Sequence, residues 1–133
     1  ITLARGSPRN PISEYLLDTV VARANSNYFE NQLCFVGHTH LPVGYFYEKN
    51  SHQVRWKLIG DKEKIKLNGR AILNPGSVGQ PRDRDNRASY AIFDTEEFTW
   101  EVHRVAYDIT KVQERILTTG LPARNVNRLT DGW

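Results

Sequence analysis

The chain has 133 residues, which suits one domain with a buried core, and 39% hydrophobic and 25% charged residues are values of an ordinary soluble globular protein. No apolar run approaches the roughly 18 residues of a membrane-spanning helix, so we expect no membrane association. The net charge is only +3, and acids alternate with bases along the chain, which argues against a nucleic-acid partner.

The cysteine and methionine counts add two expectations. Cys34 is the single cysteine and lies in an apolar run, so we expect a buried thiol in a reducing compartment, the cytoplasm. The sequence contains no methionine and begins inside what has the pattern of a strand. We therefore expect the chain to be processed, truncated or part of something longer.

The first part of the chain has a strand–helix–strand pattern. Residues 2–4 resemble the end of a strand, and the glycine, serine and prolines that follow are typical of a turn. Asn10 can cap a helix, and apolar residues at helical spacing predict that it covers residues 11–24. Residues 33–36 form a short apolar run, as in a strand buried on both faces, and lead directly into residues 37–40.

Alternating residues then predict antiparallel strands. Residues 43–47 and 54–58 have a period of two and are expected to pair through a hairpin near Asn50-Ser51. His52 falls in the same turn and is expected to be a surface residue.

The remaining strands and helix follow in the same manner. A short strand carries Ile65 and Leu67, and Asn68-Gly69 predicts a two-residue hairpin turn into the next strand. A last hairpin is expected within residues 90–102, followed by a helix over residues 109–119. The order indicates a mixed α/β fold, β-α-β followed by antiparallel strands and a closing helix, without an interior linker.

The segment Gly37-His38-Thr39-His40 is the main candidate site. It follows a buried strand, and ligands of α/β proteins collect beyond the carboxyl ends of strands. A glycine allows a sharp turn, and two imidazoles on such a turn can aim at one point. Imidazole binds zinc, iron, manganese and nickel. The pair can therefore bind a metal, or it can be a satisfied structural pair.

Other polar residues have weaker patterns. Asn74-Pro75-Gly76 suits a type II turn with a structural role. Arg82, in the charged loop that follows, could reach an anionic substrate or simply be solvated. Acids and bases alternate through this loop, which indicates a solvated face, so Arg84 and Asn86 are also expected to be solvated. His103 alternates onto the polar face of its strand and is expected to be a surface residue.

Together these motifs resemble the calcineurin-like metallophosphoesterases, especially their smaller bacterial phosphodiesterase and phosphatase branch. The resemblance rests on the Gly-His-Thr-His segment, the Asn-Pro-Gly-Ser that ends a later strand, the Gly-Ser-Pro-Arg-Asn-Pro segment and the closing Gly-Leu-Pro. It covers essentially the whole chain and implies that residues 1–133 are the C-terminal portion of a metallophosphoesterase-type α/β sandwich. The N-terminal metal-binding half would then be absent.

The resemblance also implies a chemistry, hydrolysis of a phosphoester by two divalent metal ions (manganese, iron, zinc or nickel). His38 would bind one metal and His40 the other, while the remaining ligands come from Asp-x-His, Gly-Asp and Gly-Asn-His segments upstream. Arg5 stands where family members carry a further metal-binding histidine. A guanidinium cannot ligate a metal, so Arg5 is a candidate to contact a phosphate oxygen or a neighbouring carboxylate, or it is an exposed loop residue.

Three functions remain open at this point. The first is a metal-dependent phosphoesterase whose other half lies elsewhere, and the second is an inactive remnant that serves as a binding or assembly module. The third is a small β-sandwich binding domain whose histidine pair is incidental. Half of a two-sheet sandwich leaves an apolar face open, so we expect the chain to dock on its missing half or to self-associate. Metal binding by the chain alone is expected to be weak.

Overall fold

The computed structural model describes residues 1–49, 51 and 53–133, so the predicted connection at Asn50 and the expected surface residue His52 lie outside the described residues. The elements are β1 (Thr2–Leu3), α1 (Thr19–Ala24), the 3₁₀ turn η1 (Ser26–Tyr28), β2 (Leu33–Phe35), β3 (Pro42–Tyr47), β4 (Val54–Leu58), β5 (Lys64–Lys66), β6 (Ala71–Pro75), β7 (Ala88–Asp94), β8 (Thr99–Val105), α2 (Ile109–Thr118) and α3 (Arg124–Asp131). No helix among these residues has the length and apolar character needed to cross a membrane.

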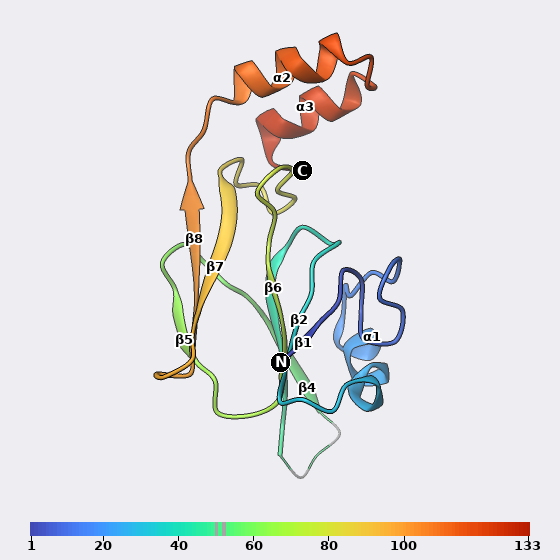
Figure 1. The fold of residues 1–133 in the computed structure, drawn as a ribbon, viewed down its shortest axis with the longest axis vertical. Coiled ribbons are helices and arrows are strands. Elements are labelled where there is room, and N and C mark those ends of the chain that lie inside the picture. The colour runs from blue at the N-terminus through green and yellow to red at the C-terminus, as the bar shows by residue number, and fades with distance from the viewer. Residues whose placement is uncertain (50, 52) are drawn as a thin grey trace.

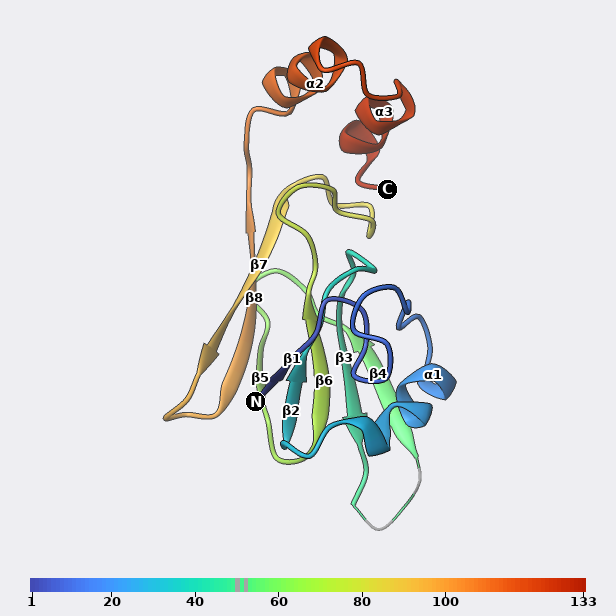
Figure 2. The ribbon, with the colours of Figure 1, turned by 45° about the vertical axis from the view of Figure 1, so that its right-hand side comes forward.

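The larger sheet has five strands in the order β1-β2-β6-β3-β4, with β1, β2 and β6 parallel to one another and β3 and β4 antiparallel. Since the three parallel strands are neighbours, their carboxyl ends meet at one edge of the sheet. Three connections leave from that edge: the first loop (residues 4–18), the histidine turn (residues 36–41) and the second loop (residues 76–87). The edge therefore brings together segments that are far apart in the sequence (Figure 2).

A smaller sheet of three strands, β5-β8-β7, lies on one face of the larger sheet, and α1 with the first loop lies on the other (Figures 1 and 2). Each interface has its own apolar cluster. Leu33 belongs to the cluster between the sheets and Cys34 to the cluster under α1, so successive residues of β2 are buried on opposite faces. This confirms the prediction of a strand buried on both sides and the mixed α/β fold.

The predicted helix over residues 11–24 is wrong in its first half, because only Thr19–Ala24 is helical. Asn10 does accept a hydrogen bond from the Ser13 amide, at 3.3 Å, but the chain then leaves the helical path. The helix that forms is capped by Asp18, whose carboxylate accepts from the Val21 amide at 2.8 Å. A network around Glu14, described below, provides the competing contacts.

The predicted hairpin turn at Asn68-Gly69 is also wrong. The strands on either side of it belong to different sheets, since β5 pairs with β8 while β6 pairs with β2 and β3. These two residues therefore carry the chain across from one sheet to the other. The later hairpin is as predicted, with Ile92 opposite Glu101 and Phe93 opposite Trp100 in antiparallel β7 and β8.

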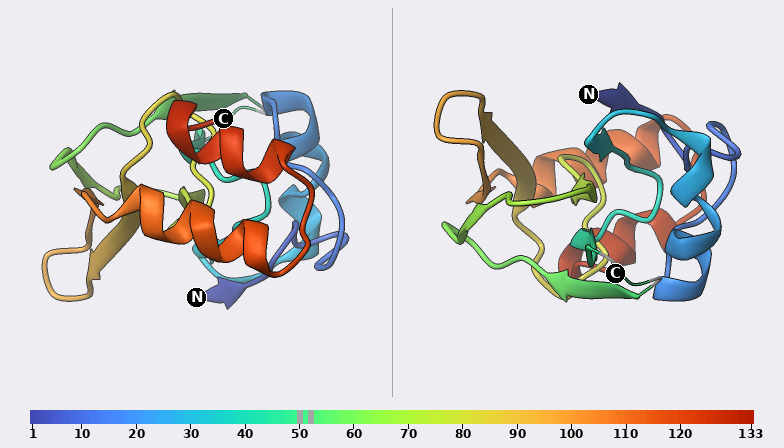
Figure 3. Two further views of the ribbon diagram at one scale, coloured as in Figure 1. Left: turned by 90° about the horizontal axis from the view of Figure 1, so that it is seen from above. Right: turned by 90° about the horizontal axis from the view of Figure 1, so that it is seen from below.

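The chain ends in a pair of helices that extends beyond the sheets (Figures 1 and 3). The predicted closing helix is confirmed as α2, where Asp108 caps the first turn by accepting from the Lys111 amide at 3.0 Å. The second helix, α3, was not predicted. Figure 3 shows the two helices side by side across the end of the molecule from which the second loop emerges.

Candidate functional site

The histidine turn is held in an unusual backbone conformation. The Val36 amide donates to the Leu73 carbonyl at 2.9 Å, and the Gly37 amide donates to the Arg5 carbonyl at 3.0 Å. His38 and His40 then have φ angles of 65° and 62°, in the left-handed region. Such a conformation costs a residue with a side chain about 1 kcal/mol, so the surrounding contacts must enforce it.

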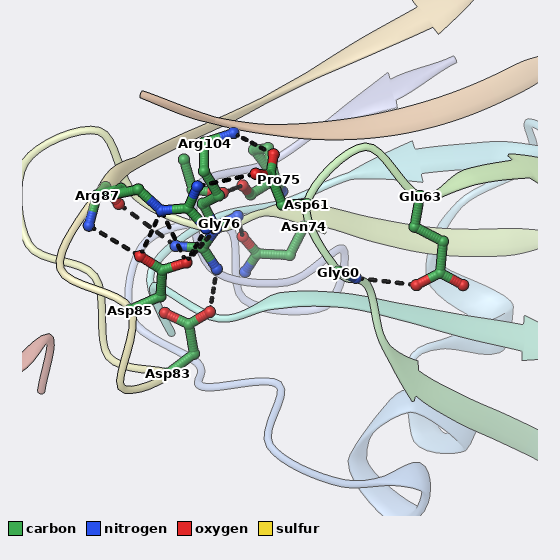
Figure 4. A network of polar contacts seen from close by, with 11 residues as sticks. Gly60, Asp61, Glu63, Asn74, Pro75, Gly76, Asp83, Asp85, Arg87 and Arg104 are labelled. Atoms are coloured by element: carbon green, nitrogen blue, oxygen red, sulfur yellow. Dashed lines mark hydrogen bonds and ion pairs between the residues drawn. The ribbon is translucent and has the colours of Figure 1, made fainter. Parts of the chain in front are cut away.

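Asn74, at the end of β6, provides much of that enforcement. Its amide nitrogen donates to the Gly37 carbonyl at 2.8 Å and to the Thr39 hydroxyl at 2.9 Å, and its oxygen accepts from the Gly76 amide at 3.0 Å. Gly76 has a φ of 87°, as the predicted turn requires at this position. One buried amide thus joins the histidine turn to the second loop, and Figure 4 shows Asn74 beside Gly76.

His40 is oriented by the second loop. Its Nδ1 lies 2.7 Å from the Gln80 carbonyl oxygen, and because a carbonyl only accepts, Nδ1 carries the proton and the Nε2 lone pair is left available. Burial lowers the pKa of His40, and the nearby charges of Arg82, His38 and Arg5 lower it further. The neutral imidazole, which is the form that binds metals, is therefore favoured.

His38 is oriented by the first loop. The ring of Tyr15 stacks on its imidazole with ring centroids 3.9 Å apart. Tyr15 is 44% exposed, and it lies at the site because the helix predicted for this segment does not form. The helix predicted over residues 11–24 included Tyr15, so this contact was not predicted. The available signal was a capping aspartate, Asp18, that starts the helix three residues later.

The two arginine candidates lie at the same corner. Arg5 is exposed; its carbonyl accepts a hydrogen bond from the Gly37 amide, and its guanidinium donates to the Ile12 carbonyl. The Arg82 amide donates to the His40 carbonyl at 3.4 Å. Both guanidinium groups are near enough to His40 to depress its pKa. The structure thus brings all four predicted site residues together, in a positively charged setting that suits an anion.

The donor set at this corner fits a metal only in part. Two imidazoles are suitable ligands, and the contact from Gln80 to Nδ1 of His40 is the kind of outer-shell hydrogen bond that metal-binding histidines make. Within residues 1–49, 51 and 53–133, however, no group of three or more histidine, cysteine, aspartate or glutamate side chains could hold a metal ion.

The second loop is fastened by an ion-pair network beneath it (Figure 4). The Arg104 side chain on β8 is only 3% exposed and pairs with Asp83 and, at 3.8 Å, with Asp85. Arg87 pairs with Asp85 at 2.7 Å and with Asp61 at 2.9 Å. These contacts with Arg87 lower the pKa of Asp85. The alternating charges of this loop indicated a solvated face, and that interpretation is wrong for Asp83, whose side chain is 11% exposed.

The first loop has a network of its own around Glu14. The Ser7 hydroxyl donates to Glu14 at 2.6 Å, the Asn25 amide donates at 2.8 Å, and Arg9 forms an ion pair. Ser7 and Asn25 are fully buried. The contact with Arg9, followed by those with Asn25 and Ser7, lowers the pKa of Glu14 to about 2. The network closes the Gly-Ser-Pro segment into a compact loop.

His103 lies away from this corner. Its Nε2 is 3.2 Å from Glu101, and its ring stacks on Tyr90 with centroids 5.1 Å apart. The side chain is 23% exposed on the outer side of the smaller sheet. His103 therefore lies on the polar face of its strand, as predicted, but its side chain is partly buried.

A family model and a relative both match most of this chain. The model of the calcineurin-like phosphoesterase superfamily domain matches residues 10–98. The uncharacterized protein MJ0912 of Methanocaldococcus jannaschii is 41% identical over 123 residues, which are 92% of this chain and 47% of that protein.

Two solved structures are also similar. A metallophosphoesterase from Sphaerobacter thermophilus has a TM-score of 0.92 and 42% identity, covering 98% of this chain and 54% of its own. The hypothetical protein PH1004 from Pyrococcus horikoshii OT3 has a TM-score of 0.67 at 22% identity, covering 98% of this chain and 46% of its own, and shares the fold. The chain spans about half the length of these relatives.

Proposed function

We propose, since this chain belongs to the calcineurin-like phosphoesterase superfamily, that it is part of a metal-dependent phosphoesterase that hydrolyses a phosphomonoester or phosphodiester. The observation that carries the proposal is the histidine turn. His38 and His40 adopt left-handed backbone conformations at the carboxyl end of β2, and a separate loop contacts each imidazole.

Each residue of the corner has a role in this proposal. His38 and His40 would each hold one of two divalent ions, drawn from manganese, iron, zinc and nickel. Metal ions held there would polarise the phosphoryl group and activate water. Gln80 keeps the Nε2 lone pair of His40 available. Arg5 and Arg82 would balance the negative charge of the phosphoester.

The missing ligands must come from another segment, and we propose that residues 1–133 are the C-terminal portion of the domain. A hollow of about 680 Å³ lies between the two sheets, lined by residues that include Leu3, Phe35, Tyr90 and Trp100. Leu3 is 76% exposed on the edge strand β1. An N-terminal portion that fills the hollow would cover Leu3 and the other apolar side chains that line it, and self-association is the alternative.

The compartment is part of the same proposal. Cys34 is free and fully buried, and burial raises the pKa of its thiol to about 11. Such an unreactive single thiol supports a cytoplasmic enzyme.

Activity is tested with a chromogenic phosphodiester and manganese, using the natural polypeptide that contains this chain. His40→Ala should lower kcat/KM by about 100-fold or more, because losing a ligand costs at least as much as losing its supporting contact. His103→Ala, a histidine change far from the corner, should leave the rate unchanged. Equal rates for wild type and His40→Ala would refute the proposal.

The chain alone provides a second measurement. Binding stabilises a fold by RT ln(1 + [L]/Kd), so with two imidazoles we expect millimolar manganese to shift the melting temperature little. A large shift that His40→Ala abolishes would mean that this chain supplies more ligands than we propose.

One observation favours a second function, an inactive remnant that acts as a binding or assembly module. Arg5 stands at a corner where a further imidazole would add a ligand, and its guanidinium cannot ligate. An Arg5→His variant separates the two proposals. Hydrolysis that is absent in wild type and appears only in Arg5→His would support the remnant, whereas an active wild type excludes it.

A further inference from the structure

The C-terminal helix pair is joined to the second loop through a glycine. The Arg84 amide donates to the Gly132 carbonyl at 2.9 Å. Gly132 has a φ of 66°, and a Cβ there would lie 2.8 Å from the backbone carbon of Asp85 and 2.9 Å from the Asn86 nitrogen. Those neighbours are backbone atoms and cannot swing aside, so only glycine fits this contact.

Side chains reinforce the same junction. The Asn86 amide donates to the Thr130 carbonyl on α3 at 3.0 Å, and the Arg84 guanidinium lies over the Trp133 ring, 4.8 Å from its centroid. Thr130 also accepts from Gln113 on α2 at 2.8 Å, which ties the two helices together. The second loop and both helices therefore form one connected unit.

The opposite end of the second loop touches His40. The Gln80 carbonyl accepts from His40 Nδ1 at 2.7 Å, and the Arg82 amide donates to the His40 carbonyl at 3.4 Å. A hollow of about 220 Å³ separates Gly79 and Gln80 from the helix pair. On the side of the helices it is lined by Ile116, Leu121, Asn125 and Leu129. The helix pair thus faces Gln80, the residue that orients His40, across this hollow.

We propose that the α2–α3 pair is a positioning element, which holds the second loop through Gly132 and Asn86 so that the Gln80 carbonyl fixes the orientation of the His40 ring. The proposal rests on the proposed metal-binding role of His40. It assigns a function to helices that lie beyond residues 10–98, the stretch that matches the family model. Gly132 and Asn86 act through Gln80 and touch no substrate.

The test compares two glycines of the helix pair. Gly132→Ala introduces a side chain against the second loop, whereas Gly120→Ala has a similar φ of 73° and meets no atom within 4 Å. The wild-type protein, measured by nitrogen NMR of the His40 ring without metal, should show the Nδ1–H tautomer. Gly132→Ala should show a mixture of both neutral tautomers, and Gly120→Ala should match wild type.

Titration of the natural polypeptide that contains this chain with manganese alone gives the functional readout. Gly132→Ala should weaken the manganese Kd about tenfold, the usual effect of losing an outer-shell partner, and Gly120→Ala should not. A His40 ring that keeps the Nδ1–H tautomer in Gly132→Ala overturns the positioning role, whatever the affinity. If no variant binds manganese but the tautomer still changes in Gly132→Ala alone, the positioning role stands and the proposed metal site fails.

A milder variant covers the case in which Gly132→Ala does not fold. Asn86→Ala removes one hydrogen bond to Thr130 and adds no atom. It should move the His40 tautomer in the same direction by a smaller amount. An unchanged tautomer in a folded Asn86→Ala protein overturns the proposal.

Discussion

The first and second loops each contact one histidine, but charges of opposite sign hold them in place. The first loop places Tyr15 on His38 and closes around a carboxylate, Glu14. The second loop places Gln80 on His40 and is fastened to a guanidinium, Arg104.

The difference decides how each loop can fail. A carboxylate titrates in acid, while a guanidinium stays charged at any practical pH. Removing the central carboxylate leaves mostly neutral donors, whereas removing the central guanidinium leaves Asp83 without its cation. The first loop should therefore be sensitive to acid, and the second loop should be the more sensitive to mutation.

Arg104→Met should have the largest effect. The Asp83 side chain is only 11% exposed and would lose its cation. Because an unpaired charge would then be buried, the free energy of unfolding should fall by about 3–5 kcal/mol. Urea unfolding followed by circular dichroism measures the change. Arg55→Met is the control, because Arg55 pairs with Glu48 at the surface with 73% of its side chain exposed. If Arg104→Met lowers the free energy of unfolding by less than about 1 kcal/mol, the second loop is not the more sensitive to mutation.

Glu14→Gln should have a smaller effect, about 2 kcal/mol, which is typical of losing hydrogen bonds to a charged acceptor. Glutamine keeps the shape and one acceptor oxygen but not the ion pair with Arg9. The same urea series measures it, with Glu48→Gln as a control in a surface pair. If Glu14→Gln lowers the free energy of unfolding as much as Arg104→Met does, the sign of the central charge does not explain the difference between the two loops.

The pH dependence separates the loops further. The contacts with Arg9, Asn25 and Ser7 lower the pKa of Glu14 from 4.5 to about 2, so its stabilisation is complete above about pH 4.5 and is lost as the pH falls toward 2. After allowance for screening by water, this contribution is about 1–2 kcal/mol.

The measurement is the difference in unfolding free energy between wild type and Glu14→Gln from pH 6 to pH 2. The difference should shrink through that window, and acids common to both proteins, such as Asp85, cancel. Curves that stay parallel would show that Glu14 is not the acid-sensitive group.

The smallest effect is expected at the contact between the first loop and His38. Tyr15→Ala should cost about 1 kcal/mol and should abolish the ring-current shift of the His38 ring protons, whereas Tyr15→Phe should preserve both. Tyr90→Ala, which removes the stack on His103, serves as the control. A His38 spectrum that is unchanged in Tyr15→Ala would mean that only the second loop orients a histidine.

Much of the fold follows from local patterns, and these were predicted. Val43, Tyr45 and Val54 of the two alternating strands lie in the core under α1, and the apolar run at residues 33–36 lies between two cores. Trp56 and Leu58 continue the alternation of β4 but are exposed. The histidine turn was found because it directly follows that run. Arg5 and Arg82 lie close to His40 at the same corner, and their contact with a substrate stays a prediction.

What could not be predicted depends on partners distant in sequence. Residues 11–14 have helical spacing, yet Glu14 binds Asn25, which is 11 positions away, and the helix there does not form. Asn68-Gly69 has hairpin composition, but the strand pairing places its neighbours in different sheets. The role of Arg104 depends on a loop 21 positions earlier, and no local pattern indicates it.

Two tyrosines on β3 give the protein an optical reporter of how the first loop and α1 are attached. The Tyr45 hydroxyl donates to the Leu16 carbonyl at 2.9 Å, and the Tyr47 hydroxyl donates to the Ala22 carbonyl at 2.5 Å. Burial raises the pKa of Tyr45 to about 12 and raises the pKa of Tyr47 as well. The stabilisation from Tyr45 is complete below the ordinary phenol pKa of about 10 and is lost as the pH rises through about 12. In alkali the ultraviolet absorbance of these two phenolates therefore appears late, and its appearance signals that the segment has come away from the sheet.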